Sequence, residues 1–415
     1  MAALSPVKPE PTTTTSAEAG GAAGTAVTRG AASHQYGVSL RLGAKMSLFS
    51  LSARAPSGMG LSVLGVRRDS RTLAGNRNAA RHWRRWSRII PMDGAPKFDL
   101  HPDMGPLLEA KAQVNTGAGN APLRAQWNNY DAALRRPYPS DMRVDDMTLA
   151  CALVGGPGKG GVWNAPARLY RPGNAPDPSP LVVYIHGGGF IKGSIQSGDP
   201  VAAGIAERAG FTVISIDYRL APEYAFPWGV EDCYAAISHI VANASRWGGD
   251  SRRVAVWGDS AGGNMTASCT LMARDRGAPG IAAYVIVYPC LTDELTAPSY
   301  AKYALAPVTT ESMDRSWSLY LGDRRPTREP YAVPVKAENL AGLPPGFIHV
   351  AEVDCLADDG VEYSRRLQAA GSPAELRVAP RMIHGFLRAR HSGPAAAAEF
   401  DLPCGFLKRT LAPSR

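Results

Sequence analysis

One pentapeptide of the chain carries a serine that can act as a nucleophile. Gly258-Asp259-Ser260-Ala261-Gly262 follows the apolar run 254–257 and precedes a segment of helical composition, 264–272. Where G-x-S-x-G joins a strand to a helix, the serine lies at the tip of a strained turn with its hydroxyl exposed. Small residues two positions to either side let strand and helix approach closely. The spacing predicts covalent catalysis through Ser260. The alternative is a tight turn with an incidental serine.

A second glycine-rich turn predicts the charge stabilisation that such a nucleophile needs. The continuous apolar run 181–185 is typical of a buried strand and ends in His186-Gly187-Gly188-Gly189-Phe190. Three glycines let the backbone turn its N–H groups toward the negative charge that develops on an acyl carbonyl under attack. A turn of this type accompanies the G-x-S-x-G serine in lipases and esterases. A phosphate-binding loop is the competing interpretation, but its characteristic Lys-Ser/Thr pair and G-x-G-x-x-G spacing are missing.

The acid that would assist Ser260 is expected at the end of a late strand. The strand-like segment 346–353 is followed directly by Asp354, which we predict to be the catalytic carboxylate. Asp358 and Asp359 are the alternatives. We expect both in the first turn of the next helix, where the helix dipole favours acidic residues.

The base is sought among eight histidines. His384 follows the strand-like segment 374–379, opens a His-Gly-Phe sequence and stands 30 residues after Asp354, which leaves room for a helix, a strand and a loop. We predict His384 to be the base, with His391 as the runner-up. His186 belongs to the glycine-rich turn, where a structural hydrogen-bonding role is expected.

Three motifs in this order resemble those of a known family. They are HGGGF at 186–190, DYRLAPE at 217–223 and GDSAGG at 258–263. They are similar to the motifs of bacterial hormone-sensitive-lipase-like esterases, within the α/β-hydrolase superfamily, and the resemblance runs from about residue 101 to about residue 408. It implies a catalytic triad in the chain order Ser, Asp, His, in which Cys355 stands where the family usually has proline.

The resemblance also implies an oxyanion hole. It would consist of the backbone N–H groups of Gly188, Gly189 and Ala261. We further expect Phe190 and Asp259, the neighbours of these groups, to contact the substrate. An ion pair between Arg219 and Glu223 is expected to shape the floor near the glycine-rich turn.

The motifs together predict a serine carboxylesterase for short- to medium-chain esters, acting through an acyl-enzyme intermediate. An amidase or deacetylase of the same fold is the first alternative. A small-molecule receptor without catalysis is the second, and the intact His384 argues against it. No cofactor and no metal are expected, because HExxH and paired CxxC motifs are absent from the sequence.

The elements that must position these residues alternate between strand and helix. This alternation predicts an α/β-hydrolase fold with a mostly parallel eight-stranded sheet flanked by helices. The expected strands are 147–153, 166–171, 181–186, 211–217, 253–258, 284–289, 347–353 and 374–379. Two segments, about 98–140 and 292–345, are expected to form a helical cap over the site. Their aromatic residues either line the site or pack the cap.

Composition separates the first 91 residues from the rest. Residues 1–91 hold 13 Lys and Arg against 3 Asp and Glu, a net charge of +10; since the whole chain carries +9, residues 92–415 sum to −1. We expect 1–91 to be a disordered basic extension. It could be a translated upstream segment with Met92 as the true start, a targeting segment or a solvated interaction arm. The near-neutral remainder, 92–415, is the expected catalytic domain and gives no case for nucleic acid binding.

Further features bound the location and assembly of the protein. No run of 18 consecutive apolar residues is present, so no membrane span is expected. Six scattered cysteines indicate reduced thiols and a cytoplasmic protein. The last helix, about 395–411, or the last strand is where a homodimer would form.

Overall fold

The computed structural model describes residues 51–52, 62–63, 98–114 and 120–413. The chain divides into two units, Met1–Gly75 and Asn76–Arg415. In the first unit the strands β1 (Leu51–Ser52) and β2 (Ser62–Val63) pair antiparallel. The disordered extension predicted over 1–91 otherwise lies outside the described residues.

An eight-stranded sheet forms the centre of the second unit, as predicted. The strand order is β10-β9-β8-β7-β5-β6-β4-β3, and β4 alone runs against the other seven strands. The strands match the predicted segments in number and chain order, with ends that differ by a few residues. They are β3 (Arg143–Ala152), β4 (Val162–Arg171), β5 (Ser179–Ile185), β6 (Thr212–Ile216), β7 (Gly249–Asp259), β8 (Ala283–Val287), β9 (Gly346–Val353) and β10 (Ala374–Ile383).

Burial explains why these segments become strands. Every residue of β5, β6 and β8 is buried, and their sequences are mostly apolar, as in strands covered on both faces, although Ser179, Thr212 and Ser215 are polar. In the outer strand β3 exposed and buried positions alternate at its end, which is the pattern of a strand with one solvated face. Parallel strands end at the same edge of the sheet. The catalytic loops predicted after β5, β7, β9 and β10 therefore share one edge.

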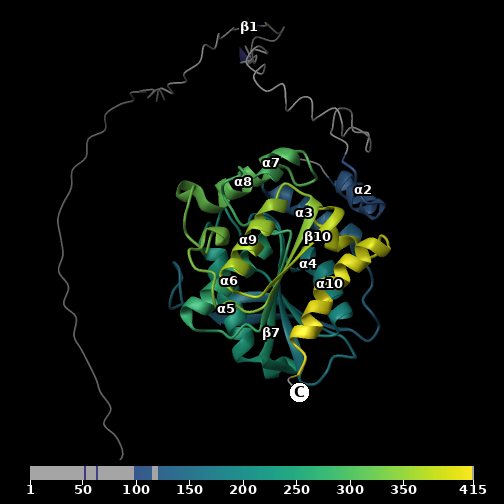
Figure 1. The fold of residues 1–415 in the computed structure, drawn as a ribbon, viewed down its shortest axis with the longest axis vertical. Helices are drawn as coiled ribbons and strands as arrows, with labels where there is room; N and C mark the ends of the chain where they lie inside the picture. Colours follow the sequence, from purple (N-terminus) through teal and green to yellow (C-terminus); the bar gives the residue numbers. More distant parts are fainter. Residues whose placement is uncertain (1–50, 53–61, 64–97, 115–119, 414–415) are drawn as a thin grey trace, which may run out of the picture. The chain divides into compact units, whose positions relative to one another are not determined.

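Helices cover both faces of the sheet. Figure 1 shows α5 (Trp228–Ala242), α6 (Ala261–Arg276) and α9 (Ala357–Ala369) on one side, and α4 (Ile195–Ala209) and α10 (Pro394–Thr410) on the other. This arrangement confirms the α/β-hydrolase fold expected from the alternation of elements.

Helices also occupy the two segments predicted to form the cap. The first holds η1 (Pro102–Met104), α2 (Gly105–Val114) and α3 (Asn120–Leu134). The second holds α7 (Pro298–Lys302), α8 (Thr310–Leu321) and the short turns η3 (Gly322–Arg324) and η4 (Pro334–Lys336). In Figure 1, α2, α3, α7 and α8 gather at one end of the unit. Two further short helices are η2 (Ala244–Trp247) and η5 (Phe386–Ala389).

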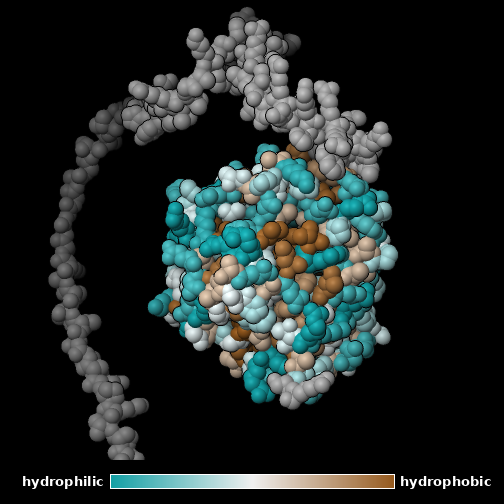
Figure 2. Space-filling view, viewed as in Figure 1, coloured by the Kyte–Doolittle hydropathy of each residue, from teal (hydrophilic) through white to brown (hydrophobic). Residues whose placement is uncertain are grey.

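The surface is mixed. Figure 2 shows mostly polar residues on the viewed face, with apolar residues gathered near its upper centre. Leu376 and Val378 are exposed on β10, the strand at one edge of the sheet. All six cysteines are buried, and none forms a disulfide bond. Within the described part of the chain, no helix is both long enough and apolar enough to span a membrane.

Candidate active site

Ser260 lies between β7 and α6, at the turn that the pentapeptide predicts. Its φ of 57° and ψ of −120° lie outside the regions that a non-glycine residue normally adopts. The flanking glycines make the turn sterically feasible. A Cβ on Gly258 would overlap the carbonyl oxygen of Gly262, and a Cβ on Gly262 would overlap that of Ile185. The tightness of this turn therefore explains why the motif needs glycine at both positions.

The three residues predicted to form the triad are hydrogen-bonded in series. His384 Nε2 lies 2.9 Å from Ser260 Oγ, and His384 Nδ1 lies 2.7 Å from Asp354 Oδ2. Asp354 also accepts a hydrogen bond from the backbone N–H of Leu356 at 3.1 Å through its other oxygen. The Asp354 side chain is almost completely buried and the His384 side chain is 7% exposed. The arrangement fixes the orientation of the imidazole toward the serine hydroxyl.

The alternative carboxylates hold other positions. Asp358 and Asp359 lie in the first turn of α9, as expected. Asp358 accepts from the backbone N–H of Ser299, while Asp359 accepts from the N–H groups of Leu291 and Thr292 and from the Tyr300 hydroxyl. Neither is hydrogen-bonded to His384. His391, the runner-up base, stands after η5 and has no hydrogen bond to Ser260.

The glycine-rich turn after β5 lies against the serine turn. Gly187 donates its backbone N–H to Asp259 Oδ1 at 3.1 Å, which ties the two turns together. Gly188 and Gly189 have φ angles of 136° and 60°, conformations that favour glycine. Among the described residues, the N–H groups of Gly188 and Gly189 have no acceptor. The N–H of Ala261 belongs to the first turn of α6, where helical N–H groups lack an intrahelical partner.

The three turns face a cavity of about 490 Å³. Ser260, His384, Gly188 and Gly189 lie on its lining. The two predicted cap segments supply most of the remaining wall, with residues from 107–111 and 123–130 on one part and residues from 307–316 on the other. Leu107, Leu108, Trp127 and Tyr130, which the sequence places at helical spacing, all line this cavity, whereas the buried aromatics Tyr300, Tyr303, Trp317 and Tyr320 pack the cap instead.

A buried ion triad, formed by Asp131, Asp259 and Arg388, supports these turns. Arg388 Nε donates to Asp131 Oδ1 at 2.6 Å and Arg388 Nη1 donates to Asp259 Oδ2 at 3.0 Å. All three side chains are at most 2% exposed. Tyr184 also donates its hydroxyl to Asp259, at 2.6 Å. The ion triad thus connects the cap helix α3, the serine turn and the loop that carries His384.

Opposite charges decide the ionisation of Asp259 and Arg388, whereas burial raises the pKa of Asp131 to about 6 despite the Arg388 guanidinium. Burial alone would raise the pKa of Asp259, but the Arg388 guanidinium and the Tyr184 hydroxyl outweigh it and hold that pKa below its usual value. Burial alone would lower the pKa of Arg388, and the two carboxylates raise it instead. Sequence reasoning missed Asp131 and Arg388, because 257 residues separate them and neither belongs to a motif.

Phe190 and Asp259, which were predicted to contact the substrate, both have side-chain partners within the protein. Phe190 is 1% exposed, does not line the cavity and stacks on Tyr320 with ring centroids 4.0 Å apart. Asp259 does line the cavity, but Tyr184, Gly187 and Arg388 already donate to its carboxylate. Phe190 anchors the glycine-rich turn to the cap helix α8.

The expected ion pair between Arg219 and Glu223 is wrong. Arg219 instead binds Asp232 of α5, with Nε 2.7 Å from Asp232 Oδ2, and Glu223 binds Arg124 of α3 at 2.7 Å. The buried Asp232 requires a counter-ion, whereas the half-exposed Glu223 reaches the cap. The DYRLAPE motif therefore links the core to the cap through two separate ion pairs.

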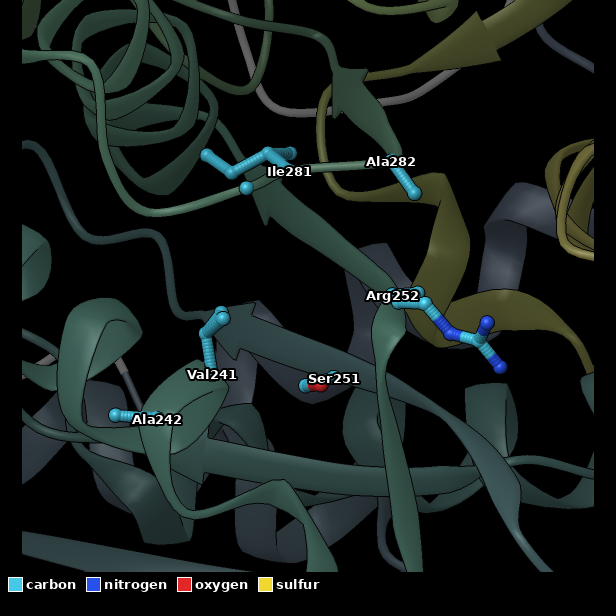
Figure 3. A pocket seen from close by; sticks show the side chains of 7 residues that line it. Val241, Ala242, Ser251, Arg252, Ile281 and Ala282 are labelled. Atoms are coloured by element: carbon cyan, nitrogen blue, oxygen red, sulfur yellow. The ribbon is translucent and has the colours of Figure 1, made fainter.

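A second hollow lies far from this chemistry in the fold. Figure 3 shows Val241, Ala242, Ser251, Arg252, Ile281 and Ala282 around it. These residues belong to the end of α5 and to the starts of β7 and β8, whereas Ser260 follows the end of β7. Ligand sites in parallel sheets lie at the carboxyl ends of strands. The cavity at Ser260 is thus the candidate active site. In the described ranges, no three His, Cys, Asp or Glu side chains cluster to hold a metal ion.

Comparisons with known proteins agree with this fold. Residues 182–388 match a family described by the α/β-hydrolase fold. The chain is 38% identical over 277 residues to Carboxylesterase NlhH of Mycobacterium tuberculosis, covering 65% of this chain and 84% of the relative. It is 37% identical over 266 residues to Esterase LipI of the same organism, covering 63% of this chain and 80% of the relative.

A solved structure shows the same similarity. The hyperthermophilic esterase from the archaeon Pyrobaculum calidifontis superposes with a TM-score of 0.65 at 32% identity, covering 73% of this chain and 96% of that one. The chain belongs to the hormone-sensitive-lipase-like family of α/β-hydrolases, as its three motifs indicated.

Proposed function

We propose that this protein is a serine carboxylesterase that hydrolyses short- to medium-chain carboxylic esters. The observation that carries the proposal is the hydrogen-bonded series Ser260–His384–Asp354 on the lining of a cavity beside a glycine-rich turn. Relatives named carboxylesterase and esterase support the same reaction class. The limited cavity, about 490 Å³ under two cap segments, supports esters of modest size.

The first half of the reaction would transfer the acyl group to the enzyme. Ser260 Oγ attacks the ester carbonyl carbon and forms a C–O bond, while His384 Nε2 takes the hydroxyl proton. Asp354 accepts from the protonated imidazole and stabilises its charge. The N–H groups of Gly188, Gly189 and Ala261 would hold the carbonyl oxygen as it becomes negative, each worth about 10²–10³ in rate. The bond to the alcohol oxygen then breaks, and His384 gives its proton to the leaving alcohol.

The second half would release the acid. His384 takes a proton from water, whose oxygen attacks the acyl-enzyme carbonyl. Collapse of the second tetrahedral intermediate breaks the bond to Ser260 Oγ, and His384 returns the proton to that oxygen. Acid and alcohol leave, and the enzyme regains its starting protonation.

The domain assignment is also a proposal. We propose that residues 92–415 form the catalytic domain with a cap from about 98–140 and 292–345. A homodimer through α10 or β10 stays a prediction, and sedimentation of the full chain tests it. Activity of a protein trimmed to 92–415, equal to that of the full chain, would support the domain boundary.

The experiment that tests the function compares the full chain with its Ser260→Ala variant. Hydrolysis of 4-nitrophenyl esters from acetyl to dodecanoyl is measured, with Ser251→Ala as the matched control because Ser251 lies at the other end of β7. Turnover should peak at short chains and fall at least a thousandfold in Ser260→Ala alone, about 4 kcal/mol of transition-state stabilisation. Folded protein without Ser260-dependent turnover on any chain length contradicts the proposal and favours amide substrates or a receptor.

A further inference from the structure

The active-site cavity carries a cationic wall, formed by Lys111, Lys192 and Arg315. Lys111 comes from α2, Lys192 from the loop that continues the glycine-rich turn, and Arg315 from α8. The backbone N–H of Lys192 donates to the carbonyl of Gly188, so this lysine is anchored directly to the proposed oxyanion turn. Three separate elements therefore bring positive side chains to one cavity.

Among the described residues, the carboxylates of the same lining form no ion pair with Lys111 or Lys192. Among the described lining residues the carboxylates are Asp259 and Glu311. Asp259 is already committed to Arg388, and Asp131, just behind the lining, is committed to Arg388 as well. Glu311 is exposed on the first turn of α8. Within the described part of the chain, Lys111 and Lys192 therefore face the cavity without a carboxylate partner.

The contacts of the two lysines are neutral. Lys192 Nζ lies 4.6 Å from the ring centroid of Trp127, and Lys111 Nζ donates to the backbone carbonyl of Pro307. Burial and the charges of Lys111 and Arg315 lower the pKa of Lys192 to about 8, against a smaller opposing effect of Asp131. Burial also lowers the pKa of Lys111. Lysines that lack a carboxylate in a partly buried site favour a negative ligand.

We propose that the cationic wall selects esters that carry a carboxylate group, on either the acyl or the alcohol side of the scissile bond. This inference rests on the proposed esterase function and names its substrate class. A bound carboxylate would accept charge-assisted hydrogen bonds from Lys192 and Lys111, which are stronger than neutral ones. Trp127 would hold Lys192 over the cavity in the free enzyme by its cation–π contact.

The test uses the full chain and two pairs of matched esters. On the acyl side, mono-4-nitrophenyl terephthalate, whose carboxylate cannot reach its own ester, is compared with its neutral amide, 4-nitrophenyl 4-carbamoylbenzoate. On the alcohol side, 4-acetoxybenzoate is compared with 4-acetoxybenzamide. Each kcat/KM is divided by the uncatalysed hydrolysis rate of the same ester. The readout is the ratio of the charged to the neutral ester, which cancels general effects on catalysis.

We expect the ratio to exceed about 10 in at least one pair, and that pair identifies the side that carries the charge. Lys192→Met should lower the ratio about 10- to 100-fold, Lys111→Met should lower it less, and added salt should lower it in the unsubstituted enzyme. Lys408→Met is the control, because Lys408 is exposed on α10 and does not line the cavity. It should leave the ratio unchanged.

Two results would overturn the inference while leaving the esterase function intact. One is a ratio at or below 1 in both pairs with clear turnover of the neutral esters. The other is a high ratio that survives both lysine substitutions. If no ester is turned over, calorimetry with Ser260→Ala and 4-acetoxybenzoate separates the two proposals. Binding that Lys192→Met abolishes would keep the anion site and reject hydrolysis, and absence of such binding would reject the anion site.

Discussion

Arg388 and Lys192 line the same cavity, but the groups that surround their positive charges differ. Arg388 is held between Asp131 and Asp259 at 2.6 and 3.0 Å, and its side chain is 2% exposed. Lys192 faces the indole of Trp127 and shares its surroundings with the cations Lys111 and Arg315. A buried charge that is paired within the chain holds the structure together, whereas a charge left unbalanced is available to a ligand.

Trp127 makes the comparison sharper because it contacts both cations. Its ring centroid lies 5.6 Å from the Arg388 guanidinium carbon and 4.6 Å from Lys192 Nζ. One indole of the cap helix α3 therefore separates the buried ion triad from the cationic wall. On the Arg388 side of the indole, the buried ion triad joins the serine turn to the predicted cap helix α3. On the Lys192 side, the cavity lining carries positive charge.

The largest effect is expected in the most completely paired part of the site. Asp354→Asn should lower kcat about 10³- to 10⁴-fold, because the amide would hold His384 in the wrong tautomer. Steady-state hydrolysis of 4-nitrophenyl acetate measures it. Asp358→Asn is the control, since its carboxylate accepts from Ser299 and not from His384. Equal losses in both variants would reject Asp354 as the carboxylate of the triad.

The next effect concerns the stability of the buried ion triad. Arg388→Met should lower the free energy of unfolding by about 3–5 kcal/mol, because Asp131 and Asp259 would remain buried without their counter-ion. Urea unfolding measures it. The control is Arg365→Met, which breaks the exposed pair with Glu362 and should leave the free energy of unfolding nearly unchanged.

A loss in Arg388→Met no larger than that of the control would place this arginine among the ordinary surface ion pairs. If Arg388→Met does not fold, Asp131→Asn offers the milder change. It keeps the Arg388 bond to Asp259 and removes only one of the two carboxylates. Its unfolding free energy should be lower than that of the unsubstituted protein, by less than the roughly 3–5 kcal/mol expected for Arg388→Met.

The same contrast separates what the sequence predicts from what it does not. The positions of Ser260 and Asp354 follow from local rules, because a strand, a tight turn and a helix leave a readable pattern of apolar and glycine residues. The sheet follows in the same way, since β5, β6 and β8 are short segments rich in apolar residues. Ends of strands were less predictable, as β7 begins at Gly249 rather than near 253.

Charge pairing over long distances could not be predicted. The motif suggested a pair between Arg219 and Glu223, four residues apart, yet Arg219 binds Asp232 and Glu223 binds Arg124. The choice of partner depends on which carboxylate is buried, and burial is a property of the assembled fold. The cationic wall was not predicted for the same reason, since its three side chains come from three distant segments of the sequence.

A smaller effect follows from the pH dependence of Lys192. Because the pKa of Lys192 is about 8, its ammonium group is charged below pH 8 and loses this charge as pH rises through that value. The carboxylate of the ester stays ionised over the same range. The ratio of charged to neutral ester in kcat/KM should therefore fall as pH rises through about 8, and it should be flat over this range in Lys192→Met. Initial rates from pH 6 to 9.5 measure it.

Other groups around Lys192 do not produce the same profile. The charged and titratable groups around the same cavity are Lys111 on α2, Arg315 and Glu311 on α8, Asp131 on α3, Asp259 and His384 on the catalytic loops and Arg388 on η5. The arginines keep their charge throughout this range. Burial raises the pKa of Asp131 to about 6, so this carboxylate would titrate at the lower end of the range and not near pH 8. His384 acts on both esters and cancels in their ratio. The variant Lys111→Met tests whether the titration belongs to Lys111 instead of Lys192. A fall near pH 8 that persists in Lys192→Met and disappears in Lys111→Met would assign the titration to Lys111.

The smallest effect is a gain in the free energy of unfolding, whereas substitution of Arg388 in the buried ion triad is expected to lower it. Because the pKa of Lys192 is lowered by folding, its charge opposes folding below pH 8, and this cost declines as pH rises from 8 toward the unfolded value near 10.4. Lys192→Met should raise the unfolding free energy at pH 7 by about 0.5–2 kcal/mol, the range typical when functional strain is removed. The gain over the unsubstituted protein should shrink by pH 9.5. A destabilised Lys192→Met would show that the lysine is held by the fold as Arg388 is, and the distinction between paired and unbalanced cations would fail at this position.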